Sequence, residues 1–272
     1  MHRIIRILIV LFAAAFALPT GSQVQSAAPT RVLFVGNSYT YVNNLPALFV
    51  ALANAQPGRN SYEADLIAAP GGSIAERWQD GVAAGEIASG RWQVLVLQER
   101  GGQLACLGKP NARSEPECQA IVAAHRKFAA LAKRHGMRVL LFGTWGPDAI
   151  WQGQLSRGLR KLADATSAEA VDIGADVRAY GEAHAETKLY TDSTLHPALD
   201  ASLLAAGRLY RQIEGRAAEP IAFETQAALL PTRAAVRADR PLSQQADMRG
   251  DGGIVRIDAA RLRPLLAATT AP

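Results

Sequence analysis

The sequence predicts an α/β fold, a three-layer sandwich in which helices cover both faces of a mostly parallel five-stranded sheet. Short, continuous apolar runs alternate along the chain with stretches of helical periodicity. Continuous apolar runs are typical of parallel strands that are buried on both faces, and alternating strands and helices imply right-handed crossovers between them. The 272 residues are enough for one such domain with a buried core.

The elements follow one another in this order. Each expected strand is a short apolar run, and the runs are 32–35, 64–68, 94–97, 139–142 and 170–173. The expected helices carry apolar residues at helical spacing, at 45–55, 74–88, 121–131, 155–162 and 199–213. Gly136 stops the third of these helices. A short strand and helix are expected within 255–267.

The chain divides into three parts. Residues 1–28 hold Arg3, Arg6 and an apolar run over 7–18, which is the pattern of a secretory signal peptide and too short for a membrane span; an uncleaved anchor is the alternative. We therefore expect export to the periplasm or medium of a bacterium. Residues 29–215 form the domain. Residues 216–272 are rich in Ala, Arg, Pro and Gly with weak periodicity, and we expect them to pack on the domain as a C-terminal extension.

Charge and cysteine content exclude several classes of protein. The formal net charge is +5, of which residues 1–28 supply two, and no basic run is interleaved with aromatic residues, so no nucleic-acid partner is expected. Cys106 and Cys118 are the two cysteines, and in an exported chain they predict a disulfide. The bridge closes a 13-residue segment, which by loop entropy stabilises the fold by about 3 kcal/mol. No metal or cofactor is expected, because no histidines cluster with the cysteines.

A serine follows the first predicted strand, in Gly36-Asn37-Ser38-Tyr39-Thr40. A strand that turns sharply into a helix presents a side chain and backbone N–H groups at the carboxyl edge of the sheet. The simpler alternative is that Asn37 or Ser38 only caps the following helix.

A histidine with a nearby carboxylate precedes the last core helix, in Asp192-Ser193-Thr194-Leu195-His196-Pro197. A carboxylate on Nδ1 of His196 fixes the tautomer and leaves Nε2 free to accept a proton from a serine. The simpler alternative is a loop histidine without a chemical role. His125 lies on the apolar side of a helix, where a place in the core or at its boundary is expected.

Together with Gly71-Gly72-Ser73, these segments resemble the motif blocks of the SGNH (GDSL-type) hydrolase superfamily over residues 31–215. The resemblance implies a flavodoxin-like fold and a serine hydrolase that acts on esters. It implies that Ser38 is the nucleophile, His196 the proton carrier and Asp192 the triad acid. The N–H groups of Ser38 and Gly71 would hold the oxyanion, with Gly72 as the second choice for the glycine.

Two departures from the family pattern stand out. The third block usually ends in Gly-x-Asn-Asp, but this chain has no asparagine there, and Gln98 is expected to supply the amide donor, as in the carbohydrate-esterase branches that the segment resembles. The acid usually lies three residues before the histidine, where this chain has Ser193. Either the loop bulges by one residue so that Asp192 reaches Nδ1, or the site works as a Ser–His dyad helped by a backbone carbonyl.

The expected function is that of an exported serine esterase for O-acetyl or similar short acyl groups on a carbohydrate. A non-catalytic glycan- or cell-wall-binding module on the same fold is the alternative. The expected substrate contacts are Asn37 and Trp145, because the loop at 143–147 follows the fourth strand at the carboxyl edge, whereas Trp151 is expected in the core. The expected partner is a small-molecule or glycan ester, without membrane insertion after signal cleavage.

Overall fold

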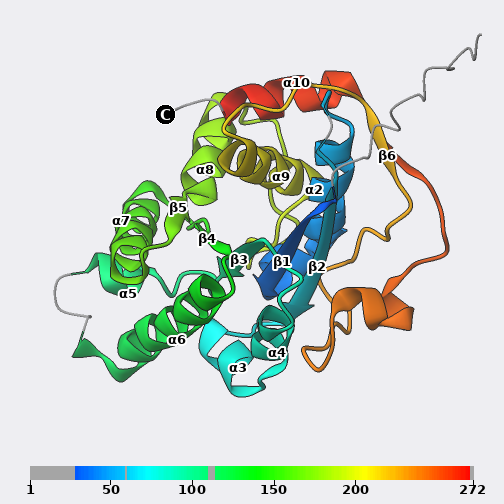
Figure 1. Ribbon diagram of the computed structural model, residues 1–272. Helices are drawn as coiled ribbons and strands as arrows, with labels where there is room; N and C mark the ends of the chain where they lie inside the picture. The colour runs from blue at the N-terminus through cyan, green and yellow to red at the C-terminus, as the bar shows by residue number, and fades with distance from the viewer. Residues whose placement is uncertain (1–27, 59, 110–113, 270–272) are drawn as a thin grey trace, which may run out of the picture.

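A computed structural model describes residues 28–58, 60–109 and 114–269 of the chain. Its centre is a five-stranded parallel sheet in the order β2-β1-β3-β4-β5, as Figure 1 shows. The strands are β1 (Thr30–Gly36), β2 (Tyr62–Ala68), β3 (Val94–Gln98), β4 (Arg138–Phe142) and β5 (Glu169–Val171). The predicted α/β fold with five parallel strands is therefore confirmed.

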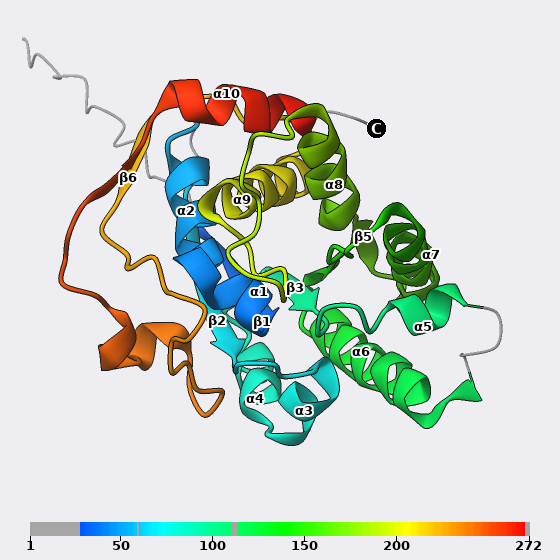
Figure 2. The same ribbon diagram turned by 180° about the vertical axis from the view of Figure 1, so that it is seen from behind.

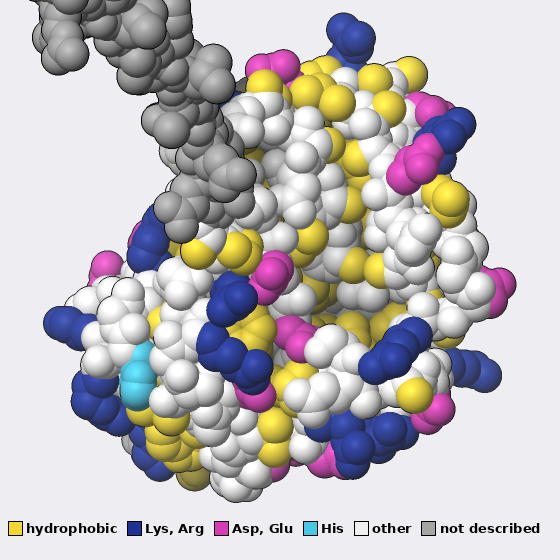
Figure 3. All heavy atoms as spheres, turned by 45° about the vertical axis from the view of Figure 1, so that its right-hand side comes forward, with side chains coloured by type: hydrophobic (Ala, Val, Ile, Leu, Met, Phe, Trp, Pro, Cys, Tyr) yellow, Lys and Arg dark blue, Asp and Glu magenta, His cyan; other side chains and the backbone are white. Residues whose placement is uncertain are grey.

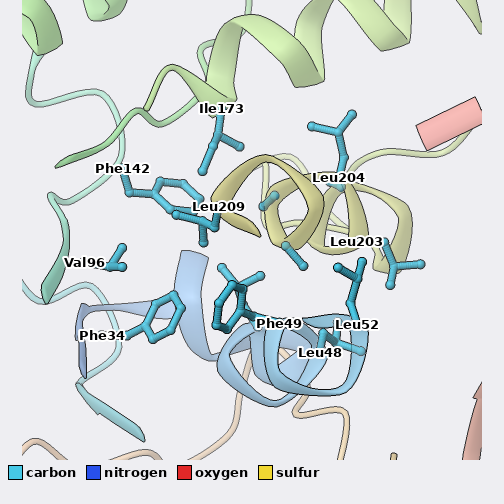
Figure 4. Packing of buried hydrophobic residues seen from close by; sticks show 14 of the residues in the cluster. Phe34, Leu48, Phe49, Leu52, Val96, Phe142, Ile173, Leu203, Leu204 and Leu209 are labelled. Carbon is cyan, nitrogen blue, oxygen red and sulfur yellow. The ribbon is translucent and has the colours of Figure 1, made fainter. Parts of the chain in front are cut away.

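Side chains of β1 alternate between two hydrophobic clusters, one on each face of the sheet. Val32 and Phe34 join one cluster, whereas Leu33 and Val35 join the other. The first face is covered by α2 (Leu45–Asn54), α8 (Ile173–Ala183) and α9 (Leu199–Glu214). The second face is covered by α3 (Ile74–Gln79), α4 (Val82–Ala88), α6 (Pro116–Arg134) and α7 (Ala149–Thr166). Figure 4 shows the side chains of the first cluster packed between the sheet, α2 and α9.

The structure differs from the sequence prediction at several places. The predicted helix 74–88 is two helices, because Gly81 between them has a φ of 75°. The predicted strand 170–173 ends at Val171, because the side chain of Asp172 accepts a hydrogen bond from Ala175 N and so begins α8. Helix α8 and the short helices α1 (Ser38–Tyr41) and α5 (Ala105–Gly108) were not predicted.

The C-terminal residues pack on the first face. They form β6 (Phe223–Thr225), the 3₁₀ turns η3 (Leu242–Gln244) and η4 (Ala246–Met248), β7 (Val255–Ile257) and α10 (Ala259–Ala268). β6 and β7 pair as an antiparallel ribbon outside the main sheet, and α10 lies alongside α9, as Figures 1 and 2 show. Leu262, Leu265 and Leu266 of α10 belong to the same hydrophobic cluster as Val32 and Phe34.

The predicted signal peptide, residues 1–28, lies outside the described residues except for Ala28. Within the part of the chain that is described, no helix combines the length and the apolar character that crossing a bilayer requires.

Candidate active site

Ser38 stands at the turn from β1 into α1. Asn37 is the N-cap of α1, and its Oδ1 accepts a hydrogen bond from Tyr39 N at 3.1 Å. Gly36 allows this turn to lie against β3, because a Cβ there would come within 2.7 Å of Gln98 Oε1. The chain therefore holds Ser38 as the first helical residue at the carboxyl edge of the sheet, with only 6% of its surface exposed.

His196 and Asp192 join Ser38 in one line of hydrogen bonds. His196 Nε2 lies 2.9 Å from Ser38 Oγ, and His196 Nδ1 lies 2.8 Å from Asp192 Oδ2. The structure thus brings together the serine, histidine and carboxylate that the sequence singled out, although 158 residues separate Ser38 from His196. This geometry suits proton transfer from Ser38 to an imidazole whose tautomer the carboxylate fixes.

The loop before His196 contains the extra residue that the sequence indicated. Leu195 has a φ of 61°, a left-handed conformation that an L-residue adopts at a cost of about 1–2 kcal/mol. Two aromatic side chains hold the loop in this form. Trp145 Nε1 donates to Leu195 O at 2.7 Å, and the Tyr39 hydroxyl donates to Thr194 O at 3.0 Å. The loop bulges by one residue, and Asp192 reaches the imidazole.

Thr194 is a site residue that the sequence analysis missed. Its hydroxyl lies 2.6 Å from Asp192 Oδ1 and 2.8 Å from His196 Nδ1. The backbone N–H of Thr194 also donates to Asp192 Oδ1, at 3.0 Å. The Thr194 hydroxyl and then His196 hold the pKa of Asp192 down to about 2. A hydroxyl residue between the acid and the histidine was the only sequence signal, and Ser193 gives the same signal, so the sequence could not tell the two residues apart.

Two backbone N–H groups are suited to hold an oxyanion. Ser38 N lies at the first residue of α1, and Gly71 lies in the exposed loop after β2 with a φ of 63°. In the described chain, neither N–H has a hydrogen-bond acceptor in the protein. Asn37 Nδ2 donates to Gly72 O at 2.9 Å, which ties this loop to the serine turn, whereas Gly72 N is already bonded to Ala69 O.

Gln98 does not serve as the amide donor that the sequence suggested. Its side chain is fully buried, and its Oε1 accepts a hydrogen bond from Asn37 N at 3.0 Å while its Nε2 donates to Glu99 O. These two partners fix the orientation of the amide and keep it inside the protein. Asn37 is likewise only 1% exposed, with both ends of its side chain bonded, so it supports the turn and does not face a substrate.

The exposure of the two tryptophans is the reverse of that expected. Trp145 is 2% exposed and stacks on Tyr39, with ring centroids 4.8 Å apart and planes 8° from parallel. It lies beneath the site and supports the loop of His196, so the prediction of a substrate contact was wrong. Trp151 was expected in the core, but 36% of its surface is exposed.

A buried polar pair lies behind the site. Glu99 Oε1 accepts hydrogen bonds from Arg100 N and Ile74 N, at 2.7 and 3.3 Å. Glu99 Oε2 has no hydrogen-bond partner in the described structure and lies 3.9 Å from His125 Nδ1. Burial raises the pKa of Glu99 to about 7 and lowers that of His125 to about 4. His125 is 1% exposed, which confirms its expected place in the core.

Cys106 and Cys118 form a disulfide, as predicted. Cys106 belongs to α5, which follows β3, and Cys118 lies in the first turn of α6. The bridge therefore anchors the chain segment that leaves the carboxyl end of β3, on the same edge of the sheet as Ser38. No group of three or more His, Cys, Asp or Glu residues suited to a metal ion occurs among the described residues.

A large hollow of the described structure lies away from Ser38. It measures about 950 Å³ and runs along α2 and the outer edge of β2, with β6, η3 and η4 of the C-terminal region as its other wall. Figure 3 shows this side of the molecule, with hydrophobic side chains visible between charged groups. This hollow lies beside the sheet and not at the carboxyl ends of the strands, where ligands of open α/β sheets bind.

Comparison of the sequence with protein-family models gives no match, and comparison with curated proteins gives none either. The structure is similar to that of Axe2, an acetylxylan esterase from Geobacillus stearothermophilus, with a TM-score of 0.51 and 15% identity, over 68% of this chain and 94% of that chain. It is also similar to the acetyl xylan esterase AlAXEase, with a TM-score of 0.52 and 14% identity, over 67% of this chain and 99% of that chain. At such low identity the likeness concerns the fold, and it confirms the predicted fold of the SGNH hydrolase superfamily.

Proposed function

We propose that this protein is a serine esterase in which Ser38 is the nucleophile. The proposal is carried by the unbroken line from Ser38 Oγ to His196 to Asp192, with distances of 2.9 and 2.8 Å. Ser38 attacks the ester carbonyl while its proton passes to His196 Nε2. The ester C–O bond then breaks, and the alcohol leaves with the proton from His196. Water hydrolyses the acyl-enzyme by the same route, with His196 taking the proton of the water.

The remaining groups of the site have electrostatic roles in this proposal. Asp192 and the Thr194 hydroxyl orient His196, and the carboxylate stabilises the imidazolium that forms during each transfer. The N–H groups of Ser38 and Gly71 hold the oxyanion, and one such donor typically contributes about 3 kcal/mol to the stability of the transition state.

The proposed substrate is an O-acetyl or similar short acyl ester of a carbohydrate. The fold neighbours are named acetylxylan esterases, which supports this substrate class. The apolar run and flanking arginines near the N-terminus support export to the periplasm or medium, where bacterial enzymes meet polymeric glycans. The disulfide is consistent with an oxidising compartment.

Labelling with a fluorophosphonate tests the proposal. The probe forms a covalent bond only with an activated serine, so intact-mass and peptide analysis should find one adduct, on Ser38. Ser38→Ala should abolish labelling, whereas Ser193→Ala, which changes an exposed serine of the histidine loop, should not. A folded wild-type protein that resists the probe and hydrolyses no ester would instead support a non-catalytic glycan-binding module.

A further inference from the structure

We propose that Trp151 and the hollow beside the disulfide bind a sugar ring of the glycan that carries the ester. This inference rests on the proposed function, because it assigns the carbohydrate part of the substrate to a specific surface. Trp151 lies in the first turn of α7, and it is one of three large hydrophobic side chains that are exposed in the described structure, with Ile150 and Ile254.

Two glycines place the indole of Trp151 at the carboxyl edge of the sheet. A Cβ on Gly146, in the loop after β4, would come within 2.5 Å of Trp151 Cδ1. A Cβ on Gly102, in the turn after β3, would lie 3.7 Å from Trp151 Nε1. The ring therefore lies between the loops that follow two neighbouring strands, where a ligand of this fold class binds.

The same turn connects Trp151 to the serine. Gly101 packs so closely on Tyr39 that a Cβ would come within 2.9 Å of the Tyr39 hydroxyl. Tyr39 directly follows Ser38 in α1. Contacts through the Gly101–Gly102 backbone and the Tyr39 ring therefore connect the exposed indole to the turn of the nucleophile. A sugar ring on Trp151 and an acyl group at Ser38 can belong to one short oligosaccharide.

A hollow of about 200 Å³ adjoins Trp151. Its other lining residues include the polar side chains of Gln103, Lys109 and Glu117, the two disulfide cysteines, and the apolar side chains of Ala105 and Ile121. Lys109 Nζ lies 5.0 Å from the centroid of the indole. Gln103 Oε1 is buried and has no hydrogen-bond partner among the described residues. The hollow thus combines an aromatic side chain with an ammonium group and a carboxylate.

This combination matches the chemistry of a pyranose. The C–H face of the ring is apolar and packs on an indole, whereas the hydroxyl groups at its rim need donors and acceptors. The volume is below the range of about 300–1,000 Å³ for sites that enclose a whole drug-sized ligand, which suits one ring of an oligosaccharide. The disulfide holds α5 to the start of α6, so the two sides of the hollow stay in place without substrate.

The experiment compares two esters and measures binding separately. In Trp151→Ala, the ratio of kcat/KM for acetylated xylooligosaccharide to kcat/KM for 4-nitrophenyl acetate should fall at least tenfold, chiefly through KM. Trp151→Phe keeps a ring and should recover part of the ratio. Ile150→Ala is the matched control, because Ile150 is an exposed neighbour outside the hollow, and it should keep the ratio within about twofold of wild type.

Binding is measured by calorimetric titration of acetylated xylooligosaccharide into the Ser38→Ala variant, which separates this inference from the proposed function. Weaker binding by at least tenfold when Trp151→Ala is added supports the sugar site. Equal binding with and without Trp151, or no binding at all, overturns it. Binding that depends on Trp151 in a protein whose wild type hydrolyses no ester would support the sugar site and overturn the esterase.

Discussion

Two oxygen atoms determine how His196 is oriented. Asp192 Oδ2 and Thr194 Oγ1 both lie 2.8 Å from Nδ1, and the Thr194 hydroxyl also contacts the other oxygen of Asp192. Because Thr194 and His196 hold the pKa of Asp192 near 2, the carboxylate stays ionised in both mildly acidic and neutral solution. Loss of activity in mild acid must therefore come from a group other than Asp192.

The Asp192→Asn variant tests the role of the carboxylate. An amide favours the wrong imidazole tautomer, so we expect kcat on 4-nitrophenyl acetate to fall by about 10⁴, as for the analogous change in a serine protease. Adding Ser193→Asp in this background places an acid at the family's usual position and gives the complementary measurement. A kcat of Asp192→Asn within a few-fold of wild type would leave a Ser38–His196 dyad and rule out Asp192.

The buried residues Glu99 and His125 change the stability of the fold with pH in opposite directions. Between about pH 4.5 and 7 the folded chain keeps a proton on Glu99 that the unfolded chain has lost, so stability falls as pH rises. Between about pH 4 and 6.5 the unfolded chain binds a proton on His125 that the folded chain lacks, so stability rises with pH. The two effects offset each other below pH 6.5.

The Glu99→Gln variant should remove only the decrease of stability with rising pH that Glu99 causes. Its free energy of unfolding, measured in urea from pH 4.5 to 8, should rise with pH up to about 6.5 and then level. At pH 8 it should exceed that of wild type by on the order of 3 kcal/mol, from about 2.5 pKa units at 1.36 kcal/mol each. Glu219→Gln, at an exposed carboxylate, should keep the wild-type profile. Identical profiles for Glu99→Gln and wild type would contradict the raised pKa.

At the scale of elements, the loop before His196 is held by an aromatic layer from two other parts of the chain. Trp145 from the loop after β4 stacks on Tyr39 from α1, and both donate hydrogen bonds to carbonyls of the histidine loop. These two bonds hold Leu195 in its left-handed conformation, and through it Asp192 in reach of the imidazole. The buried tryptophan thus acts on the site through backbone geometry.

Replacing Trp145 with Phe tests this support. The phenyl ring keeps much of the stacking on Tyr39 but leaves Leu195 O without its donor, and an unsatisfied buried group costs about 1–3 kcal/mol. We expect kcat on 4-nitrophenyl acetate to fall roughly tenfold with little change in KM, since about 1.4 kcal/mol corresponds to a factor of ten. Trp151→Phe is the control, because it leaves the hydrogen bond from Trp145 to Leu195 O in place. A loss confined to KM would show that Trp145 contacts substrate after all.

The elements that the sequence predicted well are those whose apolar pattern is strong. The buried runs at 32–35 and 94–97 gave β1 and β3 within three residues at each end. Helix α8 was missed because Gly174 and Gly181 lower its helical propensity and the apolar run before it reads as a strand. The triad was predictable because Ser38 follows a buried strand, Asp192 lies four residues before His196, and both segments resemble the motif blocks of a known hydrolase superfamily. The burial of Gln98, Asn37 and Trp145 was not, since it depends on contacts between residues distant in sequence.

At the scale of the whole molecule, the C-terminal residues complete the core. A Cβ on Gly207 of α9 would come within 2.4 Å of Leu266 of α10, so the two helices approach closely at this glycine. Leu262 and Leu265 of α10 are also buried in the cluster that covers the sheet. We therefore propose that residues 216–272 are an extension that folds together with the domain of residues 29–215.

The Leu266→Ala variant tests this proposal. Truncating a leucine that is 3% exposed should lower the free energy of unfolding by about 2–5 kcal/mol. Because the extension shares the core, urea unfolding should remain a single transition, seen at the same midpoint by far-UV circular dichroism and tryptophan fluorescence. A separate early transition, with the domain unfolding at the wild-type midpoint, would show that the extension is an independent unit.

Above all, we propose that Ser38, activated by His196 and Asp192, performs ester hydrolysis. The most direct test is the rate at which purified Ser38→Ala hydrolyses 4-nitrophenyl acetate, with circular dichroism to show that the variant is folded. The site predicts that kcat falls by at least about 10⁴, to the residual level that binding and the oxyanion groups supply alone. Turnover by folded Ser38→Ala at the wild-type rate would show that Ser38 is not the nucleophile.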